Sequence, residues 1–492
     1  MKLDTLIHDI EVTTSAGALG VEVSGIAHDS RAVQPGDVFV ALRGTRTDGH
    51  AHVADAVAAG AVAVVTEESV DSGDATGVVV DNSAKALARM AARFYGEPAE
   101  TLRLCGVTGT NGKSSTALML AAIGSATPAG RMGVIGTLGW GAGELQETTH
   151  TTPDALALHA ILRELKDSGC FGVVMEVSSH AVRQHRTCGL DFSVGILTNI
   201  THDHLDYHAD WKDYRDAKEE FTNSLVSRTR RRESGTLVYW REDAAAREVG
   251  EAFAGASVSV GHDDNADVYA SDVVADLGGT RMTLHLPDGA AVPVSMHLLG
   301  AFVATNASIA AAAAMAAGFD AEAIRSGLEG IPRIPGRFEA LGGGDRPTVI
   351  IDYAHTADAY EAVLQGCRDL GARRVTAVFG CGGDRDRDKR PLMGAAAQRL
   401  SDSVYITTDN PRTEEIERIV LDIRAGMKTG DAIVVELDRA AAIHSAIAAA
   451  SAGDVVALLG KGHEEYQLVG AEKLPFSDRA EAEGALAAWS AS

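Results

Sequence analysis

The chain has 492 residues, of which 46% are hydrophobic and 23% are charged, and its formal net charge is −24. This length exceeds what one hydrophobic core usually serves, so we expect about two to four domains of an ordinary globular protein. The strongly negative charge argues against a nucleic-acid-binding surface.

The cysteines and the chain start suggest a compartment. Five cysteines are scattered along the chain with no Cys-x-x-Cys spacing, a pattern typical of reduced thiols rather than of a disulfide frame or a zinc site. Residues 1–20 contain acidic side chains and no long apolar run, and the alanine-rich stretch 307–317 is too short to span a bilayer. We therefore expect a cytoplasmic monomer with no nucleic-acid partner and no membrane insertion.

The first part of the chain predicts a small α/β domain over residues 1–98. Apolar runs and turn residues predict strands at 38–42, 61–66 and 78–80 and helices at 52–59 and 83–94. Gly96-Glu97-Pro98 supplies a boundary.

A glycine-rich stretch, Gly106-Val-Thr-Gly-Thr-Asn-Gly-Lys-Ser114, lies between an apolar run and a helix-forming run at 116–123. Strand, glycine turn and helix are the context of a phosphate-binding loop. The helix N-terminus and the loop amides favour phosphate, Lys113 would reach the β- and γ-phosphates, and the Ser114 hydroxyl would hold Mg²⁺. An ordinary glycine turn needs neither side chain, so the pattern favours binding of ATP or GTP.

A central ATP-binding domain is predicted over residues 99–333. Thr151-Thr152-Pro153 predicts a helix start with Thr152 as N-cap, and apolar runs at 171–177 and 192–197 predict buried parallel strands. Polar residues capable of metal binding follow both strands, where ligands bind in open α/β sheets. Alternation over 282–296 predicts antiparallel strands.

The last third, residues 334–492, predicts a doubly wound, Rossmann-like domain. Strands at 348–351, 375–379, 404–407, 433–435 and 455–459 alternate with helical patterns. Polar motifs follow four of these strands and would lie on one rim, facing the nucleotide across a cleft. The predicted fold class is therefore α/β with three domains.

Two functions stay open on the residues alone: a ligase that activates a carboxylate as an acyl phosphate, and an ATPase that drives movement or regulation.

The motifs in their order resemble those of the Mur ligases. The matching stretches are Asp29-Ser-Arg, Gly-Val-Thr-Gly-Thr-Asn-Gly-Lys113, Glu176-Val-Ser-Ser-His, Asp203-His-Leu-Asp-Tyr-His, Pro335-Gly-Arg-Phe-Glu, Asp352-Tyr-Ala-His-Thr and Gly-Lys-Gly-His-Glu464. The resemblance covers nearly the whole chain. It implies an ATP-dependent ligase of peptidoglycan synthesis, on the branch that adds the third stem-peptide residue to UDP-N-acetylmuramoyl-L-alanyl-D-glutamate.

The resemblance also implies roles for single residues. Two Mg²⁺ ions would be held by Ser114, Glu176, His204 and a carbamate on Lys218, and Arg337 would stabilise charge during phosphoryl transfer. The catalytic set is thus Lys113, Lys218, His204 and Arg337. ATP would be bound by Gly109, Thr110, Asn111, Gly112, Lys113, Ser114, Ser115, Asn306, Arg337 and Asp352. The sugar-dipeptide nucleotide would contact Ser30, Thr45, Arg46, Thr47, Thr151, Thr152, Ser178, Gln184 and Arg186.

Asp409-Asn-Pro-Arg412 resembles the signature of the branch that adds meso-diaminopimelate, and the chemistry agrees. Diaminopimelate carries a distal carboxylate that lysine lacks, and Arg412 can bind it through two parallel hydrogen bonds. Lysine would leave that guanidinium unpaired, and such rejection can reach roughly 10⁴-fold. The implied diaminopimelate contacts are Arg385, Asp409, Asn410, Pro411, Arg412, Gly460 and Glu464.

Four positions depart from the family pattern: Ser114, His150, Val303 and Ala357. Val303 replaces a usual asparagine, which puts part of the adenine contact in question, whereas Ser114 keeps the hydroxyl that Mg²⁺ needs. The nearest alternatives are a lysine-adding ligase of the same family and a folylpolyglutamate synthase. The first domain and Asp-Asn-Pro-Arg412 argue against the folate enzyme.

Overall fold

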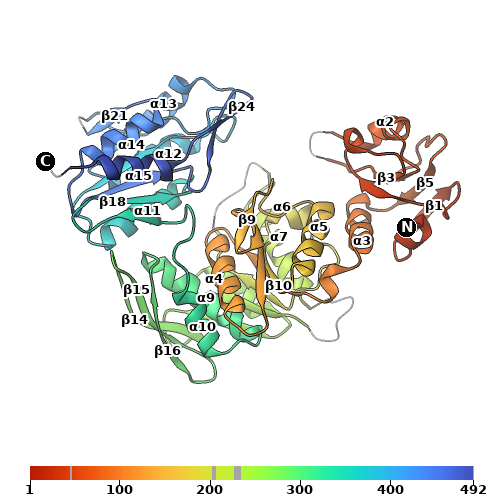
Figure 1. The fold of residues 1–492 in the computed structure, drawn as a ribbon, viewed down its shortest axis with the longest axis horizontal. Coiled ribbons are helices and arrows are strands. Elements are labelled where there is room, and N and C mark those ends of the chain that lie inside the picture. Colours follow the sequence, from red (N-terminus) through yellow and green to blue (C-terminus); the bar gives the residue numbers. More distant parts are fainter. Residues whose placement is uncertain (45–46, 202–206, 227–233, 431, 491–492) are drawn as a thin grey trace. The chain divides into compact units, whose positions relative to one another are not determined.

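The structure is a computed structural model that describes residues 1–44, 47–201, 207–226, 234–430 and 432–490. The chain divides into two compact units, residues 1–260 with 309–323 and residues 261–308 with 324–492. Each unit is built of helices and strands, which Figure 1 draws as coiled ribbons and arrows coloured by their position in the sequence. The predicted α/β class is confirmed, whereas the bounds of the three predicted domains stay predictions.

The first unit opens with a small sheet in the strand order β1-β5-β4-β3-β2. Alternate residues of its strands pack against opposite faces: Val38 and Val40 meet the core beside α3, while Phe39 packs with α2. The elements are α1 (Leu3–Leu6), β1 (Val12–Ala16), β2 (Gly25–Ala27), β3 (Asp37–Val40), α2 (Val53–Ala58), β4 (Ala63–Thr66), β5 (Thr76–Val80) and α3 (Ser83–Phe94). Short 3₁₀ turns lie at Ser30–Ala32, Gly49–His52 and Pro98–Glu100.

The rest of the first unit is a larger sheet in which β11, β6, β10 and β7 are neighbouring parallel strands. The elements are β6 (Arg103–Thr108), α4 (Lys113–Ser125), β7 (Arg131–Gly136), β8 (Gly139–Ala142), β9 (Glu144–Gln146), α5 (Ala155–Asp167), β10 (Cys170–Glu176), α6 (Ser179–Arg183), β11 (Val194–Leu197), α7 (Trp211–Ser224), β12 (Thr236–Trp240), α8 (Ala244–Ala252) and β13 (Ser257–Gly261). Leucines of α5 and aromatic residues of α7 pack into one apolar core with the strands. The carboxyl ends of β6, β10 and β11 therefore lie side by side, since parallel strands end at the same edge.

One predicted helix start is wrong. Helix α5 begins at Ala155, and its N-cap is Asp154, whose carboxylate accepts hydrogen bonds from the Leu156 and Ala157 amides, both at 3.0 Å. The Thr152 hydroxyl instead donates to the Glu176 carbonyl at 2.9 Å. Because a carboxylate caps a helix at least as well as a hydroxyl, the later residue takes the position and frees Thr152 for a contact between elements.

The second unit contains an antiparallel meander and a six-stranded sheet. The meander, β14 (Val268–Asp276), β15 (Gly279–His285) and β16 (Ala291–Met296), confirms the antiparallel strands predicted at 282–296. Helices α9 (Ala301–Ala316) and α10 (Ala321–Glu329) contain residues of both units. Among the described residues, no helix has both the length and the apolar character needed to span a membrane.

The six-stranded sheet of the second unit has the order β17-β18-β22-β19-β20-β21. Its strands alternate between two cores, one with α11, α12 and α13 and one with α14 and α15. This is the predicted doubly wound arrangement, and Figure 1 shows the helices on both faces. The elements are β17 (Glu339–Gly342), β18 (Thr348–Asp352), α11 (Ala357–Asp369), β19 (Val375–Phe379), α12 (Lys389–Leu400), β20 (Ser403–Ile406), α13 (Ile416–Arg424), β21 (Ile433–Val435), α14 (Arg439–Ala448), β22 (Val455–Leu459), β23 (Tyr466–Val469), β24 (Glu472–Pro475) and α15 (Asp478–Ala488).

Candidate active site

The phosphate loop, residues 109–112, connects β6 to α4 and requires glycine at both ends. Gly109 has φ 146° and Gly112 has φ 84°. A Cβ at Gly109 would lie 1.9 Å from the Thr198 hydroxyl, so any larger residue would clash there. The loop therefore takes the shape that its glycines permit, and α4 begins directly behind it with Lys113.

The side chains of the phosphate loop are already ordered by their neighbours. The Lys113 ammonium donates to the carbonyls of Gly109 and Thr110, both at 2.9 Å. The Asn199 side-chain oxygen accepts from the amides of Asn111 at 2.8 Å and Thr110 at 3.2 Å. Asn199 is one of the polar residues that follow β11, the strand beside β6, which explains how its side chain reaches the loop.

Lys218 lies against the same loop. Its side chain on α7 is 1% exposed, and its ammonium donates to the Gly109 carbonyl at 2.9 Å. The ammonium is also 4.3 Å from the centroid of the Tyr214 ring, whose hydroxyl lies 3.0 Å from the Thr110 hydroxyl. Lys218 is therefore part of the phosphate-loop environment and not a solvated helix lysine.

Glu176 ends β10 beside the phosphate-loop strand. It is 2% exposed, and its carboxylate accepts from the Thr137 amide at 2.9 Å and the Thr137 hydroxyl at 3.2 Å. Within the described ranges, no three His, Cys, Asp or Glu side chains gather closely enough to hold a metal alone. The available donors are oxygens, the Glu176 carboxylate and the buried Ser114 hydroxyl, and oxygen is the ligand that Mg²⁺ prefers. His204 lies outside the described residues.

The predicted dipeptide contacts of the first unit form one hydrogen-bonded group. The Arg186 guanidinium donates to the Thr152 carbonyl at 2.6 Å and to the Gln184 side chain at 2.7 Å. The Ser178 amide donates to the Thr152 hydroxyl at 3.0 Å, while the Ser178 hydroxyl caps α6. The Thr151 hydroxyl lies 3.0 Å from that of Thr137, which links the group to Glu176. Thr152 is fully buried at the centre of this group.

Ser30 and Thr47 lie in the small N-terminal sheet region, half-buried and exposed respectively, while Thr45 and Arg46 are outside the described residues. A contact near Ser30 joins this region to α5: the His28 ring lies 3.5 Å from the Asp154 carboxylate. The bond to Asp154 raises the pKa of His28 above its usual value. Burial alone would raise the pKa of Asp154, but the His28 bond and the two capped amides lower it to about 2.

In the second unit, Asp352 ends β18 and accepts from the amides of Phe338 and Ala354, both at 2.7 Å. Burial raises the pKa of Asp352, and the charge of Arg337 opposes that rise. The Arg337 guanidinium lies 5.1 Å from the centroid of the Tyr353 ring. Arg337 and Asp352 are thus brought together, whereas Asn306 lies buried on α9.

Four of the predicted amino-acid contacts, Asp409, Asn410, Gly460 and Glu464, gather at the carboxyl ends of β20 and β22. The Asn410 side-chain nitrogen donates to the Glu464 carboxylate at 2.8 Å. The buried Lys461 ammonium donates to the same carboxylate at 3.0 Å and to the Asn410 side-chain oxygen at 3.2 Å. Burial raises the pKa of Asp409, and a Cβ at Gly460 would lie 2.6 Å from its carboxylate. Lys461 carries no role in the sequence analysis, although it stands inside the Gly-Lys-Gly-His-Glu motif.

Arg412 takes a left-handed backbone conformation with φ 51°, and its guanidinium donates to the Gly383 carbonyl at 2.7 Å. Arg385, on the neighbouring loop, is exposed. A guanidinium held at one nitrogen keeps other N–H groups for a carboxylate. The group at β20 and β22 therefore combines cations with carboxylate and amide groups, as recognition of an amino acid requires.

Comparisons with known proteins agree along the whole chain. Three family models match: the Mur ligase family catalytic domain over residues 22–95, the Mur ligase middle domain over 107–314, and the Mur ligase glutamate ligase domain over 336–462.

Two curated relatives, from Syntrophomonas wolfei and Ectopseudomonas mendocina, are both named UDP-N-acetylmuramoyl-L-alanyl-D-glutamate--2,6-diaminopimelate ligase. The first is 41% identical over 97% of this chain and 98% of its own length, and the second is 42% identical over 97% of each. A solved structure of a ligase with that name matches 99% of both chains with 32% identity and a TM-score of 0.70. The chain belongs to the Mur ligase family.

Proposed function

We propose that the chain joins meso-2,6-diaminopimelate to the D-glutamate γ-carboxylate of UDP-N-acetylmuramoyl-L-alanyl-D-glutamate, with ATP as the energy source. The observation that carries the proposal is the identity of 41% with a ligase of that name over 97% of this chain. The arrangement of Arg412, Asn410 and Glu464 supports the same amino acid.

The first half-reaction activates the γ-carboxylate. One carboxylate oxygen attacks the γ-phosphorus of ATP, and the bond from this phosphorus to the β-phosphate oxygen breaks. The products are an acyl phosphate and ADP. Lys113 and the phosphate-loop amides would hold the phosphates, because cations and backbone N–H groups offset the charge that repels an incoming carboxylate. Arg337 would add a further cation, and Asn306 and Asp352 would contact the nucleoside.

The donors beside the phosphate loop fit Mg²⁺. Ser114 and Glu176 would hold one Mg²⁺ and His204 would serve a second, with Lys218 as a carbamate formed with CO₂. Bound Mg²⁺ supplies neutralisation of the charge on the phosphates. The Lys218 side chain is buried against the phosphate loop, where a carbamate would add an anionic oxygen donor of the kind that Mg²⁺ prefers.

The second half-reaction forms the amide. The amine of diaminopimelate attacks the acyl-phosphate carbonyl, the tetrahedral intermediate loses inorganic phosphate, and the amine proton passes to solvent or phosphate. Arg412 would bind the distal carboxylate and Arg385 the other carboxylate. Glu464 and the Gly460 carbonyl would receive an ammonium group, with Asp409, Asn410 and Pro411 forming the surrounding wall.

The nucleotide end of the acceptor would bind the N-terminal region at Ser30, Thr45, Arg46 and Thr47. Its sugar-dipeptide would extend along the group formed by Thr151, Thr152, Ser178, Gln184 and Arg186. The chain would act as a cytoplasmic monomer.

Phosphate release with and without each substrate tests the proposal. A ligase needs the dipeptide nucleotide and the diamino acid together before it turns over ATP, and the product gains one amide bond. Phosphate release at the same rate without either of them would contradict the proposal and favour a plain ATPase. Glutamate addition to a folate would instead indicate the folylpolyglutamate synthase reaction.

A further inference from the structure

Two loops that follow neighbouring parallel strands carry the proposed arginine contacts. The Arg385 loop, residues 380–388, follows β19, and the Arg412 loop, residues 409–415, follows β20. The loops are bonded directly: the Gly383 amide donates to the Asn410 carbonyl at 2.9 Å, and the Arg412 guanidinium donates to the Gly383 carbonyl at 2.7 Å. The position of Arg412 therefore depends on the backbone of the other loop.

That backbone is held in a conformation that only its surroundings maintain. Asp384 has φ 54°, in the left-handed region that non-glycine residues rarely adopt. Its carboxylate accepts from the Thr413 hydroxyl at 2.8 and 3.0 Å, and its amide donates to the Glu414 carboxylate at 2.6 Å. Both partners belong to the Arg412 loop, so each loop holds the other.

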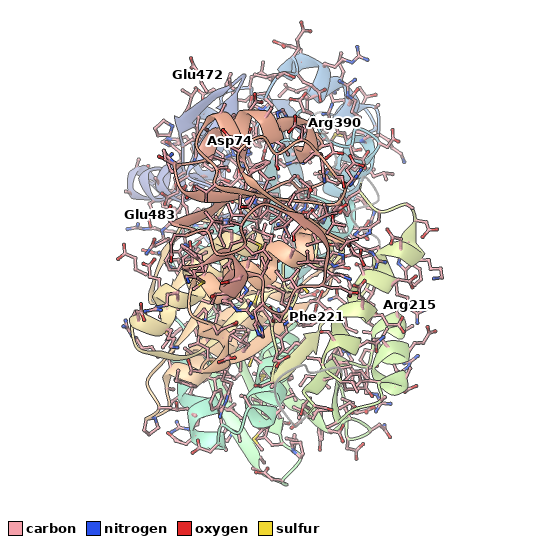
Figure 2. The ribbon with its side chains drawn as sticks, turned by 90° about the vertical axis from the view of Figure 1, so that its right-hand side faces the viewer. Asp74, Arg215, Phe221, Arg390, Glu472 and Glu483 are labelled. Atoms are coloured by element: carbon pink, nitrogen blue, oxygen red, sulfur yellow. The ribbon has the colours of Figure 1, made fainter. Side chains whose placement is uncertain are left out.

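Glu414 is itself fixed from beneath. The side chain of Arg390, which is labelled in Figure 2 and comes from α12, is fully buried and donates to the two Glu414 oxygens at 2.9 and 3.1 Å. Arg390 also donates to Asp422 at 2.8 Å and to the Gly382 carbonyl at 3.1 Å. The bond from Arg390 lowers the pKa of Glu414 to about 2, so the carboxylate is ionised at neutral pH. One buried cation thus bonds to both loops.

We propose that Glu414, held by Arg390, is a positioning residue that sets the selectivity for an amino acid with a distal carboxylate. Glu414 fixes the Asp384 backbone, this backbone fixes the Gly383 carbonyl, and the carbonyl orients the Arg412 guanidinium. The inference rests on the proposed function and deepens it. Without the Glu414 charge, Asp384 can leave the left-handed region and Arg412 loses its fixed direction.

The test compares Glu414→Gln with wild type in amide formation from meso-diaminopimelate and from L-lysine. We expect the KM for diaminopimelate to rise at least about 10-fold, because a displacement of ~1 Å in positioned groups can cost about 100-fold. The preference for diaminopimelate over lysine should fall by a similar factor, while the KM for ATP stays within about twofold of wild type.

A double variant shows whether Glu414 acts through Arg412. Combined with Arg412→Ala, the Glu414→Gln change should lower selectivity by less than about twofold more, because residues that act as one unit are not additive. Full additivity would overturn the inference, as would unchanged selectivity in Glu414→Gln alone.

Asp454→Asn is the matched control. Glu414 and Asp454 are both 8% exposed at the side chain, and each is bound by an arginine, but Asp454 precedes β22 at the opposite end of the sheet. The control should leave selectivity unchanged, and an equal loss of selectivity there would overturn the inference. If Glu414→Gln does not fold, Thr413→Val at the exposed Thr413 decides. This change removes the hydroxyl that donates to the Asp384 carboxylate, so a selectivity loss of about threefold or more supports the inference and no loss overturns it. Wild-type chain that forms no amide from either amine would instead contradict the proposed function.

Discussion

The phosphate loop and the paired arginine loops follow strands of the same kind but are built differently. The phosphate loop obtains its shape from glycines within four residues, Gly109 and Gly112, and presents mostly backbone groups. The arginine loops use left-handed residues that are not glycine, Asp384 and Arg412, and need side chains from distant positions to hold them. The backbone shape of the phosphate loop is therefore set by nearby glycines, whereas that of the arginine loops depends on side chains from distant positions.

This difference matches the tasks proposed for the two sites. The same triphosphate is used whichever amino acid is added, so a loop of backbone amides can bind it independently of the amino acid. Selection of one amino acid requires charged side chains at fixed positions, and such side chains need supporting partners. Changes at the phosphate loop should therefore slow the reaction with all amines alike, whereas changes at the arginine loops should alter the choice among amines.

The largest expected effect is at Lys218. Replacing it by alanine should lower kcat at least about 100-fold with diaminopimelate and lysine alike, the order of loss seen when one preorganised electrostatic group is removed. Steady-state rates with both amines measure this. Lys212→Ala on the same helix is the control, because Lys212 is 77% exposed and pairs with Asp216 at the surface. A loss confined to one amine would break the proposed division between the sites.

A smaller and selective effect is expected at Lys461. Its removal as Lys461→Met takes the cation from beside Glu464 and Asn410, so the KM for diaminopimelate should rise about 10-fold and stability should fall by about 3 kcal/mol. The KM for ATP should not change. Titration of each substrate measures the change in KM, and denaturant unfolding of the same preparations measures the change in stability.

Lys473→Met is the control for Lys461. Both ammonium groups lie over the Tyr466 ring, at 5.6 Å for Lys461 and 4.2 Å for Lys473, but Lys473 is exposed. Equal effects of the two changes would contradict the role given to the buried cation.

The smallest effect concerns neither site but the contact between His28 and Asp154. The raised pKa of His28 means that its contribution to stability is fully present below pH 6.5, its unfolded value, and is lost as pH rises through the folded value. The lowered pKa of Asp154 means that its contribution is lost only as pH falls from 3.8 toward about 2. Wild type should therefore lose about 0.5–1 kcal/mol between pH 6 and 8, as expected of a partly exposed ion pair.

Thermal unfolding at several pH values measures this loss. His28→Gln should flatten the dependence, whereas His52→Gln should keep it, because His52 pairs with Asp55 within one short segment at 3.4 Å. An unchanged slope in His28→Gln would show that the pair does not contribute.

The sequence predicted the parts of the molecule that depend on contiguous residues. Apolar runs gave the parallel strands and glycines gave the phosphate loop, and both are confirmed in the described residues. The helix cap at Thr152 was wrong because two capping residues, Thr152 and Asp154, stand close together and only the packed sheet decides between them. The supporting roles of Asn199 and Lys461 stayed hidden, since each depends on which strands are neighbours.

Comparison of meso-diaminopimelate with L-lysine as the amine, in wild type and in Arg412→Ala, tests the central claim most directly. We predict that wild type prefers diaminopimelate by roughly 10⁴-fold in kcat/KM, and that Arg412→Ala loses most of this preference while retaining phosphate-loop chemistry. Preference for lysine in wild type, or an unchanged preference in Arg412→Ala, would contradict the assignment of amino-acid selection to the paired loops.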